Sequence, residues 1–175
     1  MIRRIIRVIK RDGISLFLIR VLAKILRVDI GYQASKNKAW QILEAKYGNV
    51  IAYGPFKGMK LSDEVWWSKN DRITQILGIY EEHVLEKLKV FSTQGASRFV
   101  DIGAADGYFA IGMAYSKIYS KVLAFEIEPI GQTRIRDNSA INQCENVVSV
   151  FGEADYSSLK NLLGEDMKTS VLVDI

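Results

Sequence analysis

Short apolar runs alternate with mixed polar and apolar segments through the second half of the chain. Four of these runs predict strands, at residues 99–101, 121–128, 147–151 and 170–175. Between two of them, residues 132–142 have the spacing of polar and apolar positions that is typical of a helix. Strands that alternate with helices predict an α/β fold built on a doubly wound parallel sheet of about four strands.

The first half of the chain has the pattern of helices around a small hairpin. Residues 38–47 and 72–91 have helical spacing, while residues 50–53 and 59–62 have the pattern of two paired strands. These patterns divide the chain into three regions. We expect a basic helical appendage at 1–30, a helical and β-hairpin connecting region at 31–91, and the α/β domain at 92–175.

Residues 1–30 concentrate the positive charge of the chain. They contain eight Lys or Arg residues against Asp12 and Asp29, a net charge of +6, whereas the whole chain carries +4 and the remainder −2. Gly13 separates two predicted amphipathic helices. The uncharged apolar runs within them are too short to span a bilayer. Such a segment either docks on the domain or a partner, which we favour, or makes peripheral contact with an anionic membrane. The slightly acidic remainder predicts no nucleic-acid partner.

Composition narrows the class of protein further. An apolar fraction of 49% and a charged fraction of 25% indicate a folded globular chain. Cys144 is the single cysteine and His83 the single histidine, so we expect neither a disulfide within the chain nor a metal site. A reducing, cytoplasmic location follows from this cysteine usage. We expect His83 to lie on the surface of a helix.

The first predicted strand runs directly into a glycine turn. Asp101 ends the strand, Gly103 and Gly107 follow, and Ala104 keeps the side chain small between them. A parallel strand that ends in a glycine turn and leads into a helix directs backbone N–H groups towards a polar ligand. Dinucleotide-binding loops have a middle glycine where this chain has Ala105. The loop therefore favours a nucleotide cofactor without a pyrophosphate.

Acidic residues also follow the next strands. Glu126 ends the second strand, where a carboxylate can accept hydrogen bonds from both ribose hydroxyls of an adenosine. Glu153 and Asp155 follow the third strand, where either can instead cap the helix that begins near Tyr156. The fourth strand ends in Asp174.

Taken together, these motifs resemble those of the class I S-adenosylmethionine-dependent methyltransferases. The stretches 54–60, 77–81 and 125–129 are most similar to the FkbM-type branch, and the resemblance covers residues 54–175. It implies a Rossmann-like fold with S-adenosyl-L-methionine as cofactor. The residues that it implies for cofactor binding are Asp101, Gly103, Ala104 and Gly107 at the methionine end with Tyr80 and Glu81, Glu126 at the ribose, and Glu153 and Ala154 beside the adenine.

The resemblance also implies a reaction and an incomplete chain. FkbM-type enzymes commonly methylate hydroxyl groups, which implies O-methylation of a sugar or another small-molecule acceptor. Asp174 would position or deprotonate that acceptor. Family members continue through further strands, so we expect a C-terminally truncated cofactor half with little turnover. The apolar edge at residues 171–173 would then favour self-association.

Two other functions stay open at this stage. A nicotinamide-dependent oxidoreductase is disfavoured by Ala105, since that position requires the middle glycine. A non-catalytic cofactor-binding or interaction module is favoured if the natural protein ends at Ile175.

Overall fold

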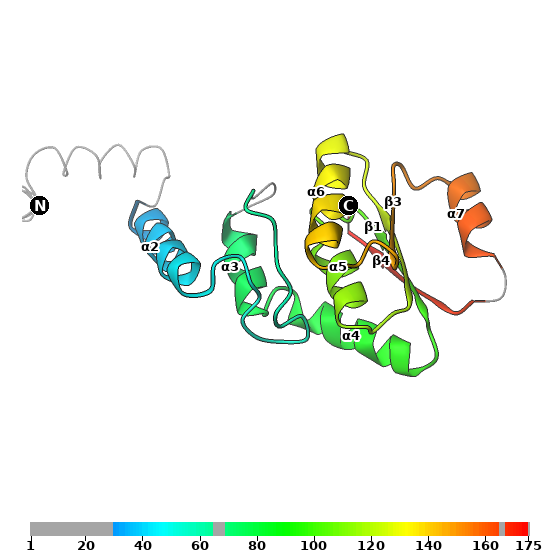
Figure 1. Ribbon diagram of the computed structural model, residues 1–175, viewed down its shortest axis with the longest axis horizontal. Coiled ribbons are helices and arrows are strands. Elements are labelled where there is room, and N and C mark those ends of the chain that lie inside the picture. The colour runs from blue at the N-terminus through cyan, green and yellow to red at the C-terminus, as the bar shows by residue number, and fades with distance from the viewer. Residues whose placement is uncertain (1–29, 65–68, 165–166, 175) are drawn as a thin grey trace, which may run out of the picture. The chain divides into compact units, whose positions relative to one another are not determined.

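The computed structural model describes residues 30–64, 69–164 and 167–174 (Figure 1). The chain separates into two compact units, Met1–Ile42 and Leu43–Ile175. The predicted basic helices at 1–30 lie outside the described residues, except for Ile30 at the start of α2 (Ile30–Tyr47). This helix begins earlier than the helix expected at 38–47. All features of the candidate site belong to the second unit.

A four-stranded parallel sheet forms the centre of the second unit. Its strands are β1 (Arg98–Ile102), β2 (Lys121–Phe125), β3 (Val148–Phe151) and β4 (Thr169–Val173), in the order β3-β2-β1-β4. All three neighbouring pairs are parallel. The chain thus moves from β1 outward to β3 and then returns to the other side of β1. This is the Rossmann-like, doubly wound arrangement that the sequence predicts, and it leaves a switch point between β1 and β4.

Helices cover both faces of the sheet (Figure 1). The helices α5 (Tyr108–Tyr115) and α6 (Pro129–Ile141) lie on one face, and α7 (Tyr156–Leu163) lies on the other. Pro129 occupies the first turn of α6, where a backbone N–H would have no acceptor within the helix, so its absence costs no hydrogen bond. Asp155 and Ser158 form a reciprocal capping box at the start of α7. Leucines of α7 pack on the core residues Val100, Leu123 and Phe125.

The single helix expected at 72–91 is two helices in the structure. They are α3 (Lys69–Leu77) and α4 (Glu82–Thr93), and His83 is exposed on the second, as expected. Gly78 breaks the run with a φ of 69°, and a Cβ atom there would lie 2.1 Å from the carbonyl oxygen of Tyr53. The backbone needs this close approach because the Ala52 N–H donates to the Ile76 carbonyl over 2.7 Å. Helical periodicity alone cannot reveal such a contact.

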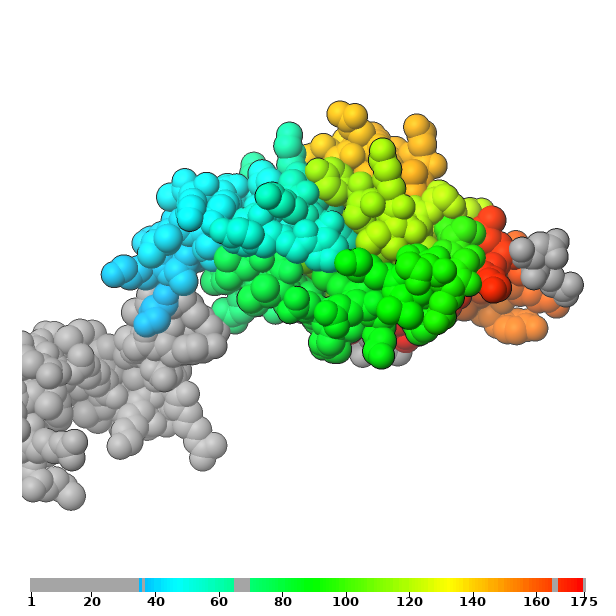
Figure 2. All heavy atoms as spheres, turned by 90° about the horizontal axis from the view of Figure 1, so that it is seen from below, coloured from blue at the N-terminus to red at the C-terminus, as the bar shows by residue number. Residues whose placement is uncertain are grey.

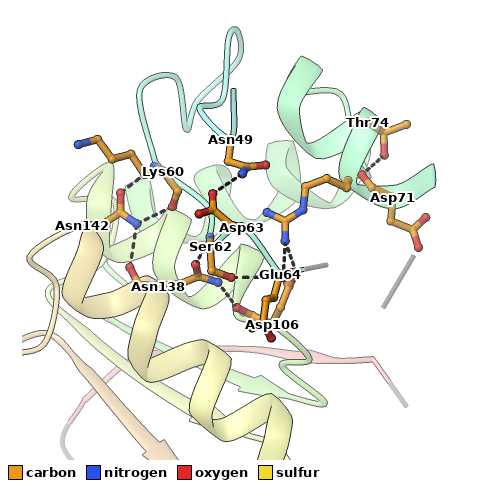
Figure 3. Close-up of polar contacts among 11 residues, drawn as sticks. Asn49, Lys60, Ser62, Asp63, Glu64, Asp71, Thr74, Asp106, Asn138 and Asn142 are labelled. Carbon is orange, nitrogen blue, oxygen red and sulfur yellow. Dashed lines mark hydrogen bonds and ion pairs between the residues drawn. The ribbon is translucent and has the colours of Figure 1, made fainter. Parts of the chain in front are cut away.

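The predicted hairpin strands at 50–53 and 59–62 are not formed as strands. A single antiparallel bridge joins Val50 and Lys60. The backbone of Lys60 instead exchanges two hydrogen bonds with the Asn142 side chain, and the Ser62 N–H donates to Asn138 Oδ1 over 2.7 Å (Figure 3). The two segments still pair briefly, since the Ile51 N–H donates to the Met59 carbonyl and the Leu61 N–H to the Asn49 carbonyl. Side chains of Asn138 in α6 and of Asn142 at its C-cap satisfy further backbone groups of residues 60–62.

Phe56 anchors the connecting region on the α/β domain. Its ring is buried against Gly112 in α5, where an added Cβ atom would lie 2.2 Å from the ring. The ring also meets Tyr108 edge-on, with 5.3 Å between the centroids. In Figure 2 the cyan residues around position 60 and the green residues that follow form one continuous surface. The part of the connecting region around Phe56 therefore shares a core with α5 in the second unit.

Candidate cofactor site

A cavity of about 620 Å³ opens at the carboxyl ends of β1, β2 and β4. Ligands of doubly wound sheets bind at this edge, next to the switch point. The lining residues are Asp71, Gln75, Tyr80, Glu81, Asp101, Gly103, Ala104, Ala105, Asp106, Tyr108, Phe109, Glu126, Ile127, Glu128 and Asp174. The cavity therefore brings together seven of the predicted site residues, whereas Gly107, Glu153 and Ala154 do not line it.

The glycine loop curves tightly after β1. Gly103 has a φ of 85° and Ala105 a φ of 51°, a conformation that costs energy for a residue with a Cβ atom. The N–H groups of Gly103 and Ala104 both donate to the Phe125 carbonyl at 2.9 Å, and the Gly107 N–H donates to the Ala104 carbonyl at 2.7 Å. The predicted cradle of free N–H donors is thus absent at these three described positions, because the loop uses the groups to hold its own shape.

Gly107 has a packing role in this structure. It is the residue before α5, with a φ of 84°, and a Cβ atom there would lie 3.2 Å from side-chain atoms of both Ile111 and Ile135. The glycine lets α5 and α6 approach each other beneath the loop. Gly107 therefore affects a ligand only indirectly, because it determines where the glycine loop lies.

Glu126 is held in one orientation at the end of β2. Its side chain is 7% exposed, its Oε2 accepts the Ala105 N–H over 2.8 Å, and its Oε1 accepts the Glu128 N–H over 2.9 Å. Each carboxylate oxygen keeps a second lone pair that can accept a further hydrogen bond. Two neighbouring acceptors with fixed positions match a pair of vicinal hydroxyl groups.

Asp101 presents a buried carboxylate beside the loop. The residue is 2% exposed, and its Oδ2 atom has no hydrogen-bond partner. Burial raises the pKa of Asp101 to about 7, opposed by the backbone N–H of Ala110 and assisted by the nearby charges of Asp174 and Glu126. This group is therefore half ionised near neutral pH and lacks a cationic partner among the described residues.

Asp106 was not singled out as a site residue from the sequence. It is buried in the glycine loop, 3.5 Å from the buried guanidinium of Arg72 in α3, and its carbonyl accepts the Asn138 Nδ2–H over 2.8 Å (Figure 3). Burial raises the pKa of the Asp106 carboxyl, and Arg72 opposes that shift. The only sequence signal for Asp106 was that it is a second carboxylate inside the glycine loop. No spacing along the chain connects Asp106 with Arg72.

Tyr80 and Glu81 lie between α3 and α4 and line the cavity. Burial raises the pKa of Tyr80 to about 12, so its hydroxyl stays protonated at neutral pH. The Tyr80 ring packs against Tyr108 and Phe109 with centroid distances of 5.3 and 5.9 Å. These two aromatic residues open α5, and the sequence reasoning missed them because they resembled ordinary core positions.

Asp174 lies at the end of β4, across the switch point from the loop. Its backbone N–H donates to the Ile102 carbonyl over 2.9 Å, and its side chain is exposed at the cavity wall. Glu153 is exposed elsewhere, beyond β3, and Ala154 packs against the core cluster of Val100, Leu123 and Phe125. The structure therefore does not bring the two predicted adenine-side residues into this cavity.

Comparison with known proteins identifies no family for the chain. No family model matches it, and no curated protein matches it. Among solved structures it is similar to a putative O-methyltransferase from Klebsiella pneumoniae, with 17% identity and a TM-score of 0.42, covering 89% of this chain and 58% of that one. It is also similar to the O-methyltransferase from Bacillus cereus in complex with SAH, with 15% identity and a TM-score of 0.40, covering 89% and 60%.

A third similar structure is TYW2 from M. jannaschii in complex with AdoMet, with 23% identity and a TM-score of 0.35, covering 54% of this chain and 38% of that one. The chain thus spans less than two thirds of the length of each of these proteins. Similarity this distant says nothing about the activity of the chain.

Proposed function

We propose that the chain binds S-adenosyl-L-methionine in this cavity and acts as a methyltransferase of the class I type. The observation that carries the proposal is the Glu126 carboxylate, fixed by two backbone N–H groups in the same cavity as Gly103. A pair of fixed acceptors at the end of the second strand suits the two ribose hydroxyls of an adenosine. The motif resemblance to the FkbM-type branch supports the same assignment.

The remaining lining residues fit the rest of that ligand. Gly103 and Ala104 leave space for the methionine end, and Tyr80 and Glu81 line the same cavity. Asp101 directs an unpaired carboxylate oxygen to the same region, where it can accept a hydrogen bond from an ammonium group.

When bound, S-adenosyl-L-methionine supplies a methyl group that its sulfonium already activates. The chain then has to align the acceptor, exclude water and take up a proton. Asp174 is the candidate for the last task, because its exposed carboxylate stands at the mouth of the cavity. We propose neutral hydroxyl groups of sugars or small metabolites as acceptors, as in the FkbM-type branch.

Replacing Glu126 with Ala should weaken the binding of S-adenosyl-L-methionine by about 1–3 kcal/mol, because two buried hydroxyl groups lose their acceptors. Calorimetric titration measures this change, with Glu126→Gln as a variant that keeps the side-chain shape. Glu145→Ala, at an exposed position away from the cavity, is the control. Unchanged affinity in both Glu126 variants would remove Glu126 from the site. Binding of NAD in place of S-adenosyl-L-methionine would overturn the proposed cofactor.

A methyl-transfer assay separates the enzyme from a cofactor-binding module. Labelled S-adenosyl-L-methionine is incubated with the chain and a panel of sugars and hydroxylated metabolites. Transfer to one of them that is lost in Asp174→Asn would establish the enzyme and the role of Asp174. Binding without transfer to any acceptor would leave the non-catalytic module as the function of this chain.

We also propose that β4 is a surface for self-association. It is an edge strand among the described residues, and its residues Val171 and Val173 are 50% and 58% exposed. Light scattering should show an average mass that rises with concentration, and Val171→Lys should suppress the rise. Val90→Lys, on α4 at a residue that is 48% exposed, should have no effect. A monomer at all concentrations would contradict the proposal.

Contact of residues 1–30 with an anionic membrane is a separate proposal that rests on their net charge of +6. These residues lie outside the described part of the chain, apart from Ile30. Among the helices that the structure describes, none combines the length and the apolar character that crossing a bilayer requires.

A further inference from the structure

The cavity carries charge of one sign. Every charged side chain among its described lining residues is acidic, and Glu81, Asp101 and Asp174 come from three different elements of the chain. Two of the remaining carboxylates have partners inside the protein, since Arg72 faces Asp106 and backbone N–H groups hold Glu126. Carboxylates gathered in a concave site focus a negative potential on whatever occupies it.

Asp101 shows that this potential is aimed at a ligand. Its side chain is almost completely buried, yet the Oδ2 atom has no donor within the protein. The buried cation Arg72 makes its ion pair with Asp106. A buried carboxylate without a partner is costly, so a ligand that brings positive charge to this point gains binding free energy.

Aromatic rings complete the same part of the cavity. Tyr80, Tyr108 and Phe109 line it, and the Tyr108 ring meets each of the other two nearly perpendicular, at 5.3 and 5.4 Å between centroids. The hydroxyl of Tyr108 is buried and has no partner. Aromatic faces attract cations, and the attraction is stronger where water is excluded. Rings and carboxylates together are the surroundings that a compact organic cation prefers.

We propose that this cavity selects its ligand by the positive charge at sulfur and binds the sulfonium S-adenosyl-L-methionine more tightly than the neutral thioether S-adenosylhomocysteine. The inference rests on the proposed function. In the transfer, the bond from sulfur to the methyl carbon would break with its electron pair left on sulfur, while the acceptor oxygen would bond to the methyl carbon and lose its proton to the carboxylate of Asp174. The sulfur thus becomes neutral, the attraction disappears, and the product leaves the acidic cavity easily.

The test compares three ligands by calorimetric titration of the full chain. They are S-adenosyl-L-methionine, S-adenosylhomocysteine, and sinefungin, an analogue that carries a protonated amine in place of the methylated sulfonium. At low salt, the two cationic ligands should bind at least about tenfold more tightly than the thioether. At about 0.5 M NaCl the ratio should shrink severalfold, because salt screens the charges at the open mouth of the cavity.

Two variants test which carboxylates cause the preference for the charged ligands. Asp174→Asn, at an exposed position, should narrow the ratio of the affinities for the charged and the neutral ligands severalfold without changing the melting temperature. Asp101→Asn should weaken the binding of all three ligands alike, because they share the ammonium group that is assigned to Asp101. Glu86→Gln, at an exposed position of α4 outside the cavity, should leave the ratio unchanged.

The outcomes separate the two proposals. Equal or tighter binding of S-adenosylhomocysteine at low salt would overturn the charge selection and leave the proposed function standing. No binding of any of the three ligands would overturn the proposed function itself.

Discussion

Replacing Asp101 with Asn should raise the free energy of unfolding of the ligand-free protein by about 2–4 kcal/mol at about pH 8. The wild-type carboxylate is buried, and its Oδ2 atom has no partner. The amide of Asn has nearly the same shape and carries no charge, and its oxygen can still accept the Ala110 N–H. The variant should therefore melt several degrees higher while it binds S-adenosyl-L-methionine less tightly. A residue that weakens the fold to serve a ligand gives this opposite pair of effects.

The free energy of unfolding of the wild-type protein should also depend on pH, because Asp101 titrates differently in the folded and unfolded states. In the folded protein Asp101 keeps its proton up to a pKa of about 7, whereas the ordinary value is 3.8. Between about pH 4 and pH 7 the folded state therefore binds more protons than the unfolded state, and the free energy of unfolding falls as pH rises. The fall attributable to Asp101 is on the order of 4 kcal/mol.

Denaturant melts at several pH values check this account. The fall in stability between about pH 4 and pH 7 should be clearly smaller in Asp101→Asn than in the wild-type protein. Glu86→Gln, which removes an exposed carboxylate of α4, should follow the wild-type curve. An Asp101→Asn variant that is less stable than the wild type at pH 8 would show that the charge is compensated in the folded protein.

Gly112→Ala should destabilise the protein by about 3 kcal/mol or more, although alanine is the better helix former. The reason is the ring of Phe56, which would lie 2.2 Å from the new Cβ atom and is itself fully buried. Either the ring leaves its place or the connecting region moves away from α5. Thermal or denaturant unfolding measures the loss.

A second substitution tests whether the contact with Phe56 is the cause. Combined with Phe56→Leu, Gly112→Ala should cost clearly less than it does alone, because the ring that obstructs the methyl group is gone. Gly152→Ala is the matched control, since a Cβ atom there meets nothing closer than 3.8 Å. Full additivity of the two substitutions would refute the proposed packing between the connecting region and α5.

The central sheet could be predicted from the sequence because each strand has a local signature. Apolar runs that end in Asp101 and Phe125 alternate with helical segments, and a parallel sheet follows from that alternation. Glu126 could be predicted for the same reason, since its place depends only on where β2 ends. The orientation of its carboxylate depends on the N–H of Ala105 and could not be read from the pattern.

The parts that could not be predicted depend on contacts between distant segments. The break at Gly78 exists because the backbone of Tyr53 approaches it. The predicted hairpin is reduced to a single bridge between Val50 and Lys60, and side chains of Asn138 and Asn142 accept N–H groups of residues 60 and 62. The ion pair of Arg72 and Asp106 joins two elements that no motif connects. The loop around Gly103 was expected to offer free N–H groups, but the Phe125 carbonyl accepts those of both Gly103 and Ala104 in the folded chain.

The most direct measurement is a crystal structure of the chain grown with saturating S-adenosyl-L-methionine. We expect the two ribose hydroxyls within about 3 Å of the Glu126 carboxylate, with the methionine end beside Gly103 and Asp101. A nucleoside bound elsewhere, or an empty cavity at a concentration that saturates the protein in solution, would contradict the account.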